Sequence, residues 1–182
     1  MILENGWGDT GAKARVDSEG RLRTRSTIVT SDRHQNEDGK VWSCTATATT
    51  GTTDNFFYII KNNGANNLAI TDIRAKSSAV TELTYEVVSG TPIYVTGTDI
   101  TPIPRNLGTN KVPNAIIKYD SDITGIASGG EIFFEQCDTA DKMYHLRTSS
   151  NIIIPQGQMI AIKSSAAATI KCLVSLIELE NE

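Results

Sequence analysis

Apolar and polar residues alternate over most of the chain after Lys40, in short runs separated by turn-forming residues. In the segment 41–50 (VWSCTATATT), every second residue from Trp42 to Ala48 is apolar or a cysteine, and the residues between them are hydroxylated. The segment 169–179 (TIKCLVSLIEL) has a similar alternation from Ile170. Side chains on one face of a β-strand recur every second residue, so both segments predict strands with one buried face.

Further runs of this kind predict a chain built almost entirely of strands. We expect strands at 41–50, 56–61, 68–75, 80–88, 91–96, 114–119, 131–137, 142–147, 151–154, 158–163 and 169–179. The run 56–61 (FFYIIK) is apolar on both faces, which is typical of a strand that lies between two layers. The segment 80–88 is expected to have one face with Thr81, Leu83, Tyr85 and Val87 and another with Glu82, Thr84 and Glu86.

The spacing of turn formers limits the architecture further. Prolines, glycines and asparagines between residues 97 and 113 predict one long irregular loop. No long stretch has the spacing of an amphipathic helix, and no repeat of fixed period occurs, which disfavours a helical body, a propeller and a solenoid. Antiparallel strands in this number are best closed as two packed sheets, so the sequence predicts an all-β sandwich.

Residues 1–39 differ from the rest and are expected to form an extended arm, with the β-sandwich domain at 40–182. They hold few large apolar residues and many charges. The turn formers at 17–20 (DSEG) separate the segments 14–16 and 21–29, which predict either a small hairpin or two extended pieces.

Composition excludes several classes of protein. A chain of 182 residues with 39% hydrophobic and 21% charged residues buries a core without disulfides or metals. Its formal charge of −4 argues against a general nucleic-acid coat or a membrane-surface binder, because both need positive charge. No apolar run is long enough to span a membrane, and residues 1–8 lack the pattern of a secretory signal. We therefore expect no nucleic-acid partner and no membrane partner.

Candidate side chains for catalysis or metal binding are few. Cys44, Cys137 and Cys172 allow at most one disulfide, which favours a reducing compartment over a disulfide scaffold. Cys44 and Cys172 alternate with apolar neighbours and are expected to fill the core. His34 and His145 are far apart in the sequence, so we expect a solvated loop for the first and a strand position with a satisfied ring nitrogen for the second.

Nucleophile motifs and phosphate-binding loops are absent from the sequence. We therefore expect no enzyme, no cofactor and no bound metal. Paired carboxylates contributed by distant strands remain an open alternative, because sequence alone does not reveal them.

One cluster of positive charge lies in the arm, at Lys13, Arg15, Arg21, Arg23 and Arg25. With Asp17 and Glu19 counted, the local charge of residues 13–25 is +3. In an extended chain the last three arginines share one face. Three interpretations stay open: docking on an acidic protein surface, binding of phosphate, or a solvated face without further function.

Charge alone does not order this arm. Fixing the backbone of the 13 residues 13–25 costs on the order of 13–26 kcal/mol, whereas exposed ion pairs return about 0.2–1 kcal/mol each. Order therefore needs strand pairing, or burial of apolar residues such as Val16 and Leu22 against a partner. We hypothesise that residues 1–39 gain order on assembly, which strong hydrogen-exchange protection of 13–29 in a dilute monomer would refute.

Three stretches carry a resemblance that covers most of the chain. They are 14–27 (ARVDSEGRLRTRST), 56–62 (FFYIIKN) with the strand after it, and 154–162 (IPQGQMIAI) followed by 168–180. In these stretches the chain resembles minor head and decoration proteins of tailed double-stranded DNA bacteriophages. The stretches are similar to that family's leading segment, early core strand and closing strand pair.

The resemblance implies a capsid decoration (cement) protein with an antiparallel two-sheet jelly-roll sandwich and an extended N-terminal arm. Such proteins commonly stand as trimers on the outside of the phage head and clamp neighbouring capsid subunits. The implied partners are the major capsid protein and copies of the chain itself in a homotrimer. The implied location is the capsid exterior of a virion assembled in the host cytoplasm. By analogy, the partner-binding residues are Lys13, Arg15, Arg21, Leu22, Arg23 and Arg25.

Two other functions remain as alternatives. A head-fibre, tail or receptor-binding jelly-roll protein of the virion needs a carbohydrate site with exposed aromatic rings. The candidates for such rings are Trp42, Tyr94, Tyr119 and Tyr144, which strand packing also explains. A sugar-active or metal-dependent enzyme on a β-sandwich would be indicated by bound metal that is lost on His34→Ala.

Overall fold

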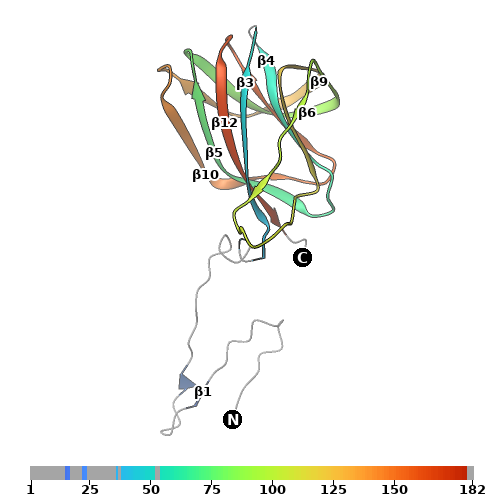
Figure 1. Ribbon diagram of the computed structural model, residues 1–182, viewed down its shortest axis with the longest axis vertical. Helices are drawn as coiled ribbons and strands as arrows, with labels where there is room; N and C mark the ends of the chain where they lie inside the picture. The colour runs from blue at the N-terminus through green and yellow to red at the C-terminus, as the bar shows by residue number, and fades with distance from the viewer. Residues whose placement is uncertain (1–14, 17–21, 24–35, 37, 52–53, 180–182) are drawn as a thin grey trace.

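The computed structural model describes residues 15–16, 22–23, 36, 38–51 and 54–179, and for 15–16, 22–23 and 146–151 it describes the backbone alone. The body is a two-layered β-sandwich (Figure 1). Its strands are β3 (Val41–Thr49), β4 (Asn55–Asn62), β5 (Asn67–Ser77), β6 (Thr81–Tyr94), β7 (Thr98–Asp99), β8 (Ile103–Pro104), β9 (Ala115–Cys137), β10 (Met143–Ile154), β11 (Met159–Ser164) and β12 (Thr169–Leu179). Two short strands precede them, β1 (Arg15–Val16) and β2 (Leu22–Arg23). Nowhere in the described ranges does the chain form a helix with the length and apolar character needed to cross a membrane.

The strands of the body form two antiparallel sheets. Sheet I has the order β10-β5-β12-β3-β8, and sheet II has the order β4-β11-β6-β9-β7. When only the eight long strands are numbered along the chain, these orders become 6-3-8-1 and 2-7-4-5. This is the strand order of a jelly roll. The predicted fold class, an all-β sandwich of two antiparallel sheets, is confirmed.

The main core fills the space between the two sheets. β3 contributes Trp42, Cys44, Ala46 and Ala48, and β12 contributes Ile170, Cys172, Val174 and Leu176, all at most 4% exposed. From sheet II, Tyr85 stacks on Phe133 with the ring centroids 4.1 Å apart. The alternation seen in 41–50 and 169–179 therefore identified the buried faces of β3 and β12 correctly.

β4 is buried on both faces, as its sequence predicted. Tyr58 and Ile60 belong to the main core, whereas Ile59 belongs to a second cluster on the opposite face of sheet II. The other buried members of that cluster are Val88, Ile123, Met159 and Ala161. The second cluster gives sheet II an apolar interior of its own.

The second cluster exists because β9 bends and pairs with two strands. Its later part pairs with β6, and its earlier part pairs with β4. Ile123 lies at the bend and is opposite Tyr94 of β6 and Phe56 of β4. Since β11 pairs with both β4 and β6, the four strands β4, β11, β6 and β9 form a closed ring of pairings around the second cluster.

Several predicted strand boundaries are wrong. The separate strands expected at 80–88 and 91–96 are one strand, β6, and those at 114–119 and 131–137 are one strand, β9. Likewise, 142–147 and 151–154 belong to β10. The glycines and polar residues between them accompany register shifts within the ladders instead of ending the strands. The expected loop 97–113 contains the short strands β7 and β8.

The two faces predicted for 80–88 are present, but they do not divide into a buried face and a solvated one. β6 keeps an unbroken register with β11 from Leu83 to Val88. Thr84 and Glu86 are buried although they lie opposite to the main core, because the bend of β9 covers that face. Val87, on the face of the main core, is 39% exposed.

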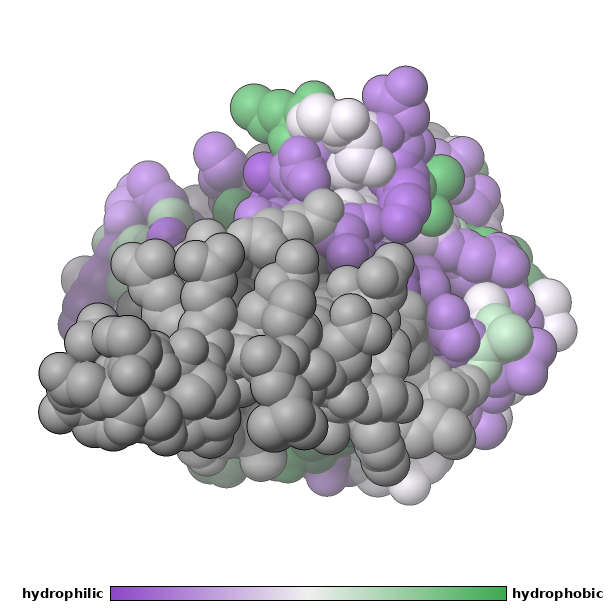
Figure 2. All heavy atoms as spheres, turned by 90° about the horizontal axis from the view of Figure 1, so that it is seen from below, coloured by the Kyte–Doolittle hydropathy of each residue, from purple (hydrophilic) through white to green (hydrophobic). Residues whose placement is uncertain are grey.

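The visible surface of the body is mixed in character. In the end-on view of Figure 2, hydrophilic residues cover most of the coloured surface, and hydrophobic ones form separate groups among them. No single apolar face dominates the coloured surface in this view.

Candidate partner interface

The predicted partner-binding residues fall into two groups. Arg15 lies in β1, and Leu22 and Arg23 lie in β2. Lys13, Arg21 and Arg25 lie outside the described residues. β1 and β2 pair antiparallel, so of the two forms expected for this segment the structure shows the hairpin.

The register of this hairpin places two arginine positions opposite each other. Arg15 is the partner of Arg23, and Val16 is the partner of Leu22. Directly opposed positions of an antiparallel pair share a face, so two arginine positions occupy one face and two apolar positions occupy the other.

The chain enters the body through a segment that is held from two sides. On one side, the Nζ of Lys111 donates a hydrogen bond to the carbonyl oxygen of Asp38 at 2.7 Å. The indole N–H of Trp42 donates to the carbonyl oxygen of Lys111 at 2.9 Å. On the other side, the backbone N–H of Glu178 donates to the carbonyl oxygen of Lys40 at 3.0 Å. Residues 38–42 are therefore fixed between the loop that contains Lys111 and the end of β12.

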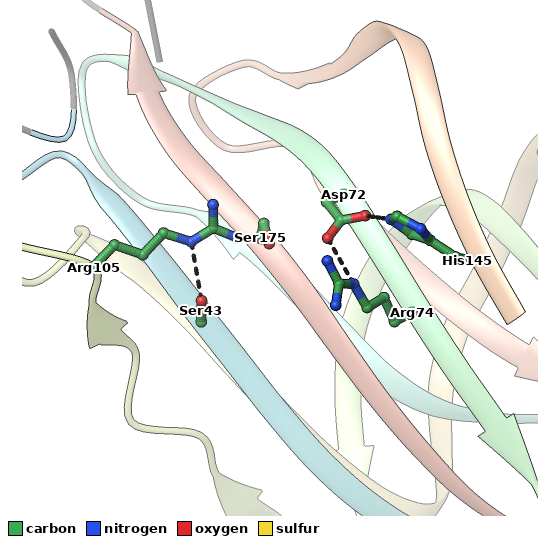
Figure 3. Close-up of polar contacts among 6 residues, drawn as sticks. All are labelled: Ser43, Asp72, Arg74, Arg105, His145 and Ser175. Carbon is green, nitrogen blue, oxygen red and sulfur yellow. Dashed lines mark hydrogen bonds and ion pairs between the residues drawn. The ribbon is translucent and has the colours of Figure 1, made fainter. Parts of the chain in front are cut away.

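Arg105 reinforces this attachment from the same loop. Its backbone N–H donates to the carbonyl oxygen of Val41 at 2.9 Å. Its side chain lies across the outer face of sheet I (Figure 3), where Nε donates to Ser43 Oγ at 3.2 Å and Nη2 donates to Ser175 Oγ. Ser43 and Ser175 are directly paired residues of β3 and β12. One side chain thus connects the loop with both strands at the point where the arm begins.

A second polar group lies on the same face of sheet I (Figure 3). Asp72 of β5 accepts a hydrogen bond from Arg74 Nε at 3.1 Å through Oδ2 and contacts His145 Nε2 of β10 through Oδ1. The expectation of a strand histidine with a satisfied ring nitrogen is therefore confirmed for His145. The Arg74 side chain is 49% exposed, so its ion pair with Asp72 contributes only about 0–1 kcal/mol.

Glu86 and Lys163 form an ion pair on the side of sheet II that β9 covers. Lys163 Nζ lies 2.8 Å from Glu86 Oε1, and the Glu86 side chain is 4% exposed. Burial raises the pKa of the Glu86 carboxyl, but the hydrogen bonds from Lys163 and Ser128 and the positive charge of Lys163 together outweigh burial, and the pKa lies below its usual value. Glu86 is consequently ionised and paired at neutral pH, which is the state of a structural carboxylate.

The cysteines are packing residues. Cys44, Cys137 and Cys172 are all buried and free. Burial raises the pKa of Cys44 and Cys172 to about 12 and that of Cys137 to about 11. A thiol with such a pKa is protonated at neutral pH and is a poor nucleophile. The expectation that Cys44 and Cys172 fill the core is confirmed.

The other side chains singled out in the sequence do not converge on a site. Within the ranges that the structure covers, no group of three or more His, Cys, Asp or Glu side chains is placed to hold a metal ion. His34 lies outside the described residues. Trp42 is 1% exposed, and Tyr94, Tyr119 and Tyr144 are partly buried against the two cores. Strand packing therefore accounts for these four aromatic rings.

Sequence reasoning missed the loop residues Arg105 and Lys111. Both lie in the segment 97–113, whose irregular composition gave no indication of a role. Lys111 contacts residues that precede it by 69 and 73 positions, a relation that only the folded chain establishes. The positive charge of Arg105 and Lys111 gave only weak evidence that the loop holds the arm, because charged loop residues are most often solvated.

No protein-family model matches this chain, and neither does any curated protein or any solved structure.

Proposed function

We propose that this chain is a virion structural protein, a capsid decoration (cement) protein that binds the outside of a major capsid shell and stabilises it. In this role the jelly-roll body is the rigid part, and residues 1–39 attach it to the shell. The role is mechanical and involves no catalytic step. Several copies act on one shell, as a homotrimer by analogy with the family that the sequence resembles. The observation that carries the proposal is the fixed attachment of the arm at residues 38–42.

An arm holds the body on a shell effectively only when the residues that join it to the body do not move relative to the body. The base of this arm is bonded to the loop 105–111 and to β12, and Trp42 continues it directly into the main core. A force that reaches residues 38–42 is therefore transmitted to the body through these bonds. This arrangement suits a protein that reinforces a shell.

The body has the construction expected of a rigid support. Sheet II packs against sheet I through the main core and has a second apolar cluster behind it. Close-packed interiors resist deformation, and the ring of pairings around the second cluster limits sliding of β4 and β6. Sheet II is thus stiffened by apolar clusters on both of its faces, whereas a sandwich with a single core leaves one face of each sheet uncovered.

The charge of the arm favours an acidic surface of the shell as its partner. Residues 13–25 have a local charge of +3, and Arg15 lies opposite Arg23 in the hairpin. Carboxylates inserted between such arginines would replace repulsion with charge-assisted hydrogen bonds. A single contact of this kind is modest, but repetition around a symmetric shell raises the effective concentration of every further contact.

The proposal is tested by mixing the purified full-length chain with undecorated phage heads and scoring bound density by electron microscopy. We expect saturable binding that weakens as salt is added, because exposed charges are screened. A variant with Arg21→Ala, Arg23→Ala and Arg25→Ala should bind about tenfold more weakly, since three cations of the contact are lost and each exposed pair contributes about 0.2–1 kcal/mol. A chain without residues 1–30 should not bind.

A matched control replaces three cations of the body, with Lys61→Ala, Lys118→Ala and Lys171→Ala. This variant has the same net charge as the arm variant and should bind heads like the wild type. Undiminished binding after removal of residues 1–30 would refute the arm as the fastener. Failure of the wild type to bind heads, together with binding to host cells, would favour the head-fibre, tail or receptor-binding function instead.

A further inference from the structure

Two strand edges of the body have no partner strand in the described part of the chain. β9 pairs only with β6 over Glu131–Cys137, and β10 pairs only with β5 over Met143–Arg147. Both ladders are regular close to the turn that joins these strands, without a register shift from Phe133 to Cys137 or from Met143 to Arg147. An open edge of this kind presents unpaired N–H and C=O groups to any strand that approaches it.

The β9 edge lacks two of the features that usually prevent such pairing. Natural edge strands are protected by proline, by inward-pointing charges or by lysines. The β9 edge, residues 130–137, contains no proline and no lysine. It exposes Ile132 at 38% and Phe134 at 57%, and the β10 edge exposes Met143 at 52%. Large apolar side chains therefore line both open edges.

The two edges have opposite charge. Around the β9 edge, residues 130–138 include Glu131, Glu135 and Asp138 and no cation. Around the β10 edge, residues 142–147 include Lys142 and Arg147 and no acid. Asp141, which stands between the two segments, is already engaged in an ion pair with Lys76 at 3.1 Å.

We propose that the β9 edge of one copy pairs with the β10 edge of a second copy of this chain. Within one copy the two edges belong to different sheets of the sandwich and do not form a ladder with each other. Between copies they offer main-chain hydrogen bonds, apolar contact and charge complementarity at one interface, the mode known as strand addition. Each copy has one edge of each kind, so the contact is heterologous: it gives a ring where the rotation between copies closes and an open chain where it does not.

This interface does not involve the arm and extends the proposed function without depending on it. Copies whose bodies pair edge to edge are held together by this contact, whichever surface their arms contact. Loss of the edge contact and loss of shell binding are therefore separable observations.

Sedimentation equilibrium of the full chain at low salt tests the proposal. We expect a concentration-dependent oligomer that dissociates as salt is raised. Glu135→Lys with Asp138→Lys should raise the dissociation constant more than about tenfold, and Lys142→Glu with Arg147→Glu should do the same, because each places like charges across the contact. Glu131 is left unchanged because its charge acts on Lys163, which pairs with Glu86.

The decisive variant combines all four reversals. When the charges of both edges are reversed, the two edges are complementary again, and association should return to near the wild-type level. Lys61→Glu with Lys171→Glu matches the change in net charge of Lys142→Glu with Arg147→Glu and should associate like the wild type. The arm variant with Arg21→Ala, Arg23→Ala and Arg25→Ala should also associate like the wild type. Phe134→Ser should weaken association without a change in charge.

Circular dichroism and urea unfolding of each variant confirm that its body is folded. A wild-type chain that stays monomeric at every concentration overturns the proposal. So does an oligomer that is insensitive to both double reversals, or a fourfold variant that associates no better than either double variant while folded.

Discussion

At the scale of single residues, a few polar side chains join parts of the chain that are far apart in the sequence. Trp42 donates its indole N–H to the carbonyl oxygen of Lys111, 69 positions away. Asp120 accepts hydrogen bonds at Oδ2 from the backbone N–H groups of Thr96 at 2.9 Å and of Gly97 at 3.0 Å. Each contact fixes an end of the segment 96–111, which composition alone presents as an irregular loop.

Replacement of Trp42 by Phe should loosen the attachment of the arm. The change removes the indole N–H, leaves the carbonyl oxygen of Lys111 without its donor and creates space in the main core. We expect the free energy of unfolding to fall by about 1–3 kcal/mol, measured by urea denaturation. Tyr58→Phe is the matched control, because the buried hydroxyl of Tyr58 has no hydrogen-bond partner in the described part of the chain. Its removal should leave stability unchanged or raise it, and a comparable loss in both variants would contradict the assigned role of the indole.

Asp120 should make stability depend on pH in the acid range. Burial raises the pKa of its carboxyl, but the hydrogen bonds from Thr96, Ser121 and Gly97 outweigh burial, and the net pKa is lowered from 3.8. A carboxylate with a lowered pKa in the folded state stabilises the fold above its unfolded pKa, and this contribution disappears as the pH falls through the folded pKa. The loss therefore begins near pH 4 and continues below it.

Urea unfolding from neutral pH down to about pH 2 tests this sign. The wild type should lose stability below about pH 4, and Asp120→Asn should be less stable at neutral pH and lose less on acidification. Asp122→Asn removes a neighbouring carboxylate that makes none of these bonds and controls for the change in charge. Parallel pH profiles of wild type and Asp120→Asn would be incompatible with the role assigned to Asp120.

At the scale of strands, the bend of β9 turns a simple sheet into a ring with its own apolar interior. Gly125 is central to this bend, because its φ is +71° and a Cβ atom there would lie 2.5 Å from the carbonyl oxygen of Thr91. Backbone carbonyls do not move aside easily, so the position demands glycine for two reasons, its φ and its space. The later part of β9 reaches β6 and its earlier part reaches β4 only if this bend is made.

Gly125→Ala should therefore destabilise the second cluster strongly. We expect a loss of about 3 kcal/mol in the free energy of unfolding, from the positive φ and the clash together. Gly157→Ala separates the two causes, because Gly157 has a φ of +77° but nothing within 4 Å of its Cβ position. That variant should lose only about 1 kcal/mol. Equal losses at both positions, measured by the same urea titration, would show that the close approach to Thr91 contributes nothing.

The bend also explains which features of the strands the sequence predicts and which it does not. Alternation marked the buried faces of β3 and β12, and the double-sided apolar run marked β4 as a strand between layers. It did not predict that β6 and β9 are continuous, because Ser89, Gly90 and the glycines near 125–130 have the composition of turns. In the folded chain they accompany register shifts inside a long two-stranded ladder. Local composition does not distinguish a turn that ends a strand from an irregularity that bends it.

The candidate interface was predictable to a similar extent. The turn formers at 17–20 suggested the pairing of Arg15 and Val16 with the segment after the turn, and the register of β1 and β2 agrees with that. The attachment of the arm through Arg105 and Lys111 depends on tertiary contacts over more than 60 positions, which no local pattern encodes.

At the scale of the whole molecule, the two sheets are held together by one continuous main core that contains all three cysteines. Cys44 and Cys172 come from sheet I and Cys137 comes from sheet II, and each is at most 1% exposed. A reagent can reach these sulfur atoms only if the sheets separate or if the chain unfolds. Thiol chemistry is therefore a direct measure of whether the body opens in parts or as a single unit.

We expect all three thiols to resist alkylation in the native protein and to become reactive together. Their raised pKa values suppress the thiolate as well, so burial and protonation act in the same direction. Labelling with iodoacetamide across a urea series, read by mass spectrometry, should show unmodified and triply modified chains with little in between. The urea midpoint of labelling should coincide with that of circular dichroism, as two-state unfolding requires. Early labelling of Cys137 alone would show that sheet II opens before sheet I, and a body that yields in this way would be a poor support for a shell.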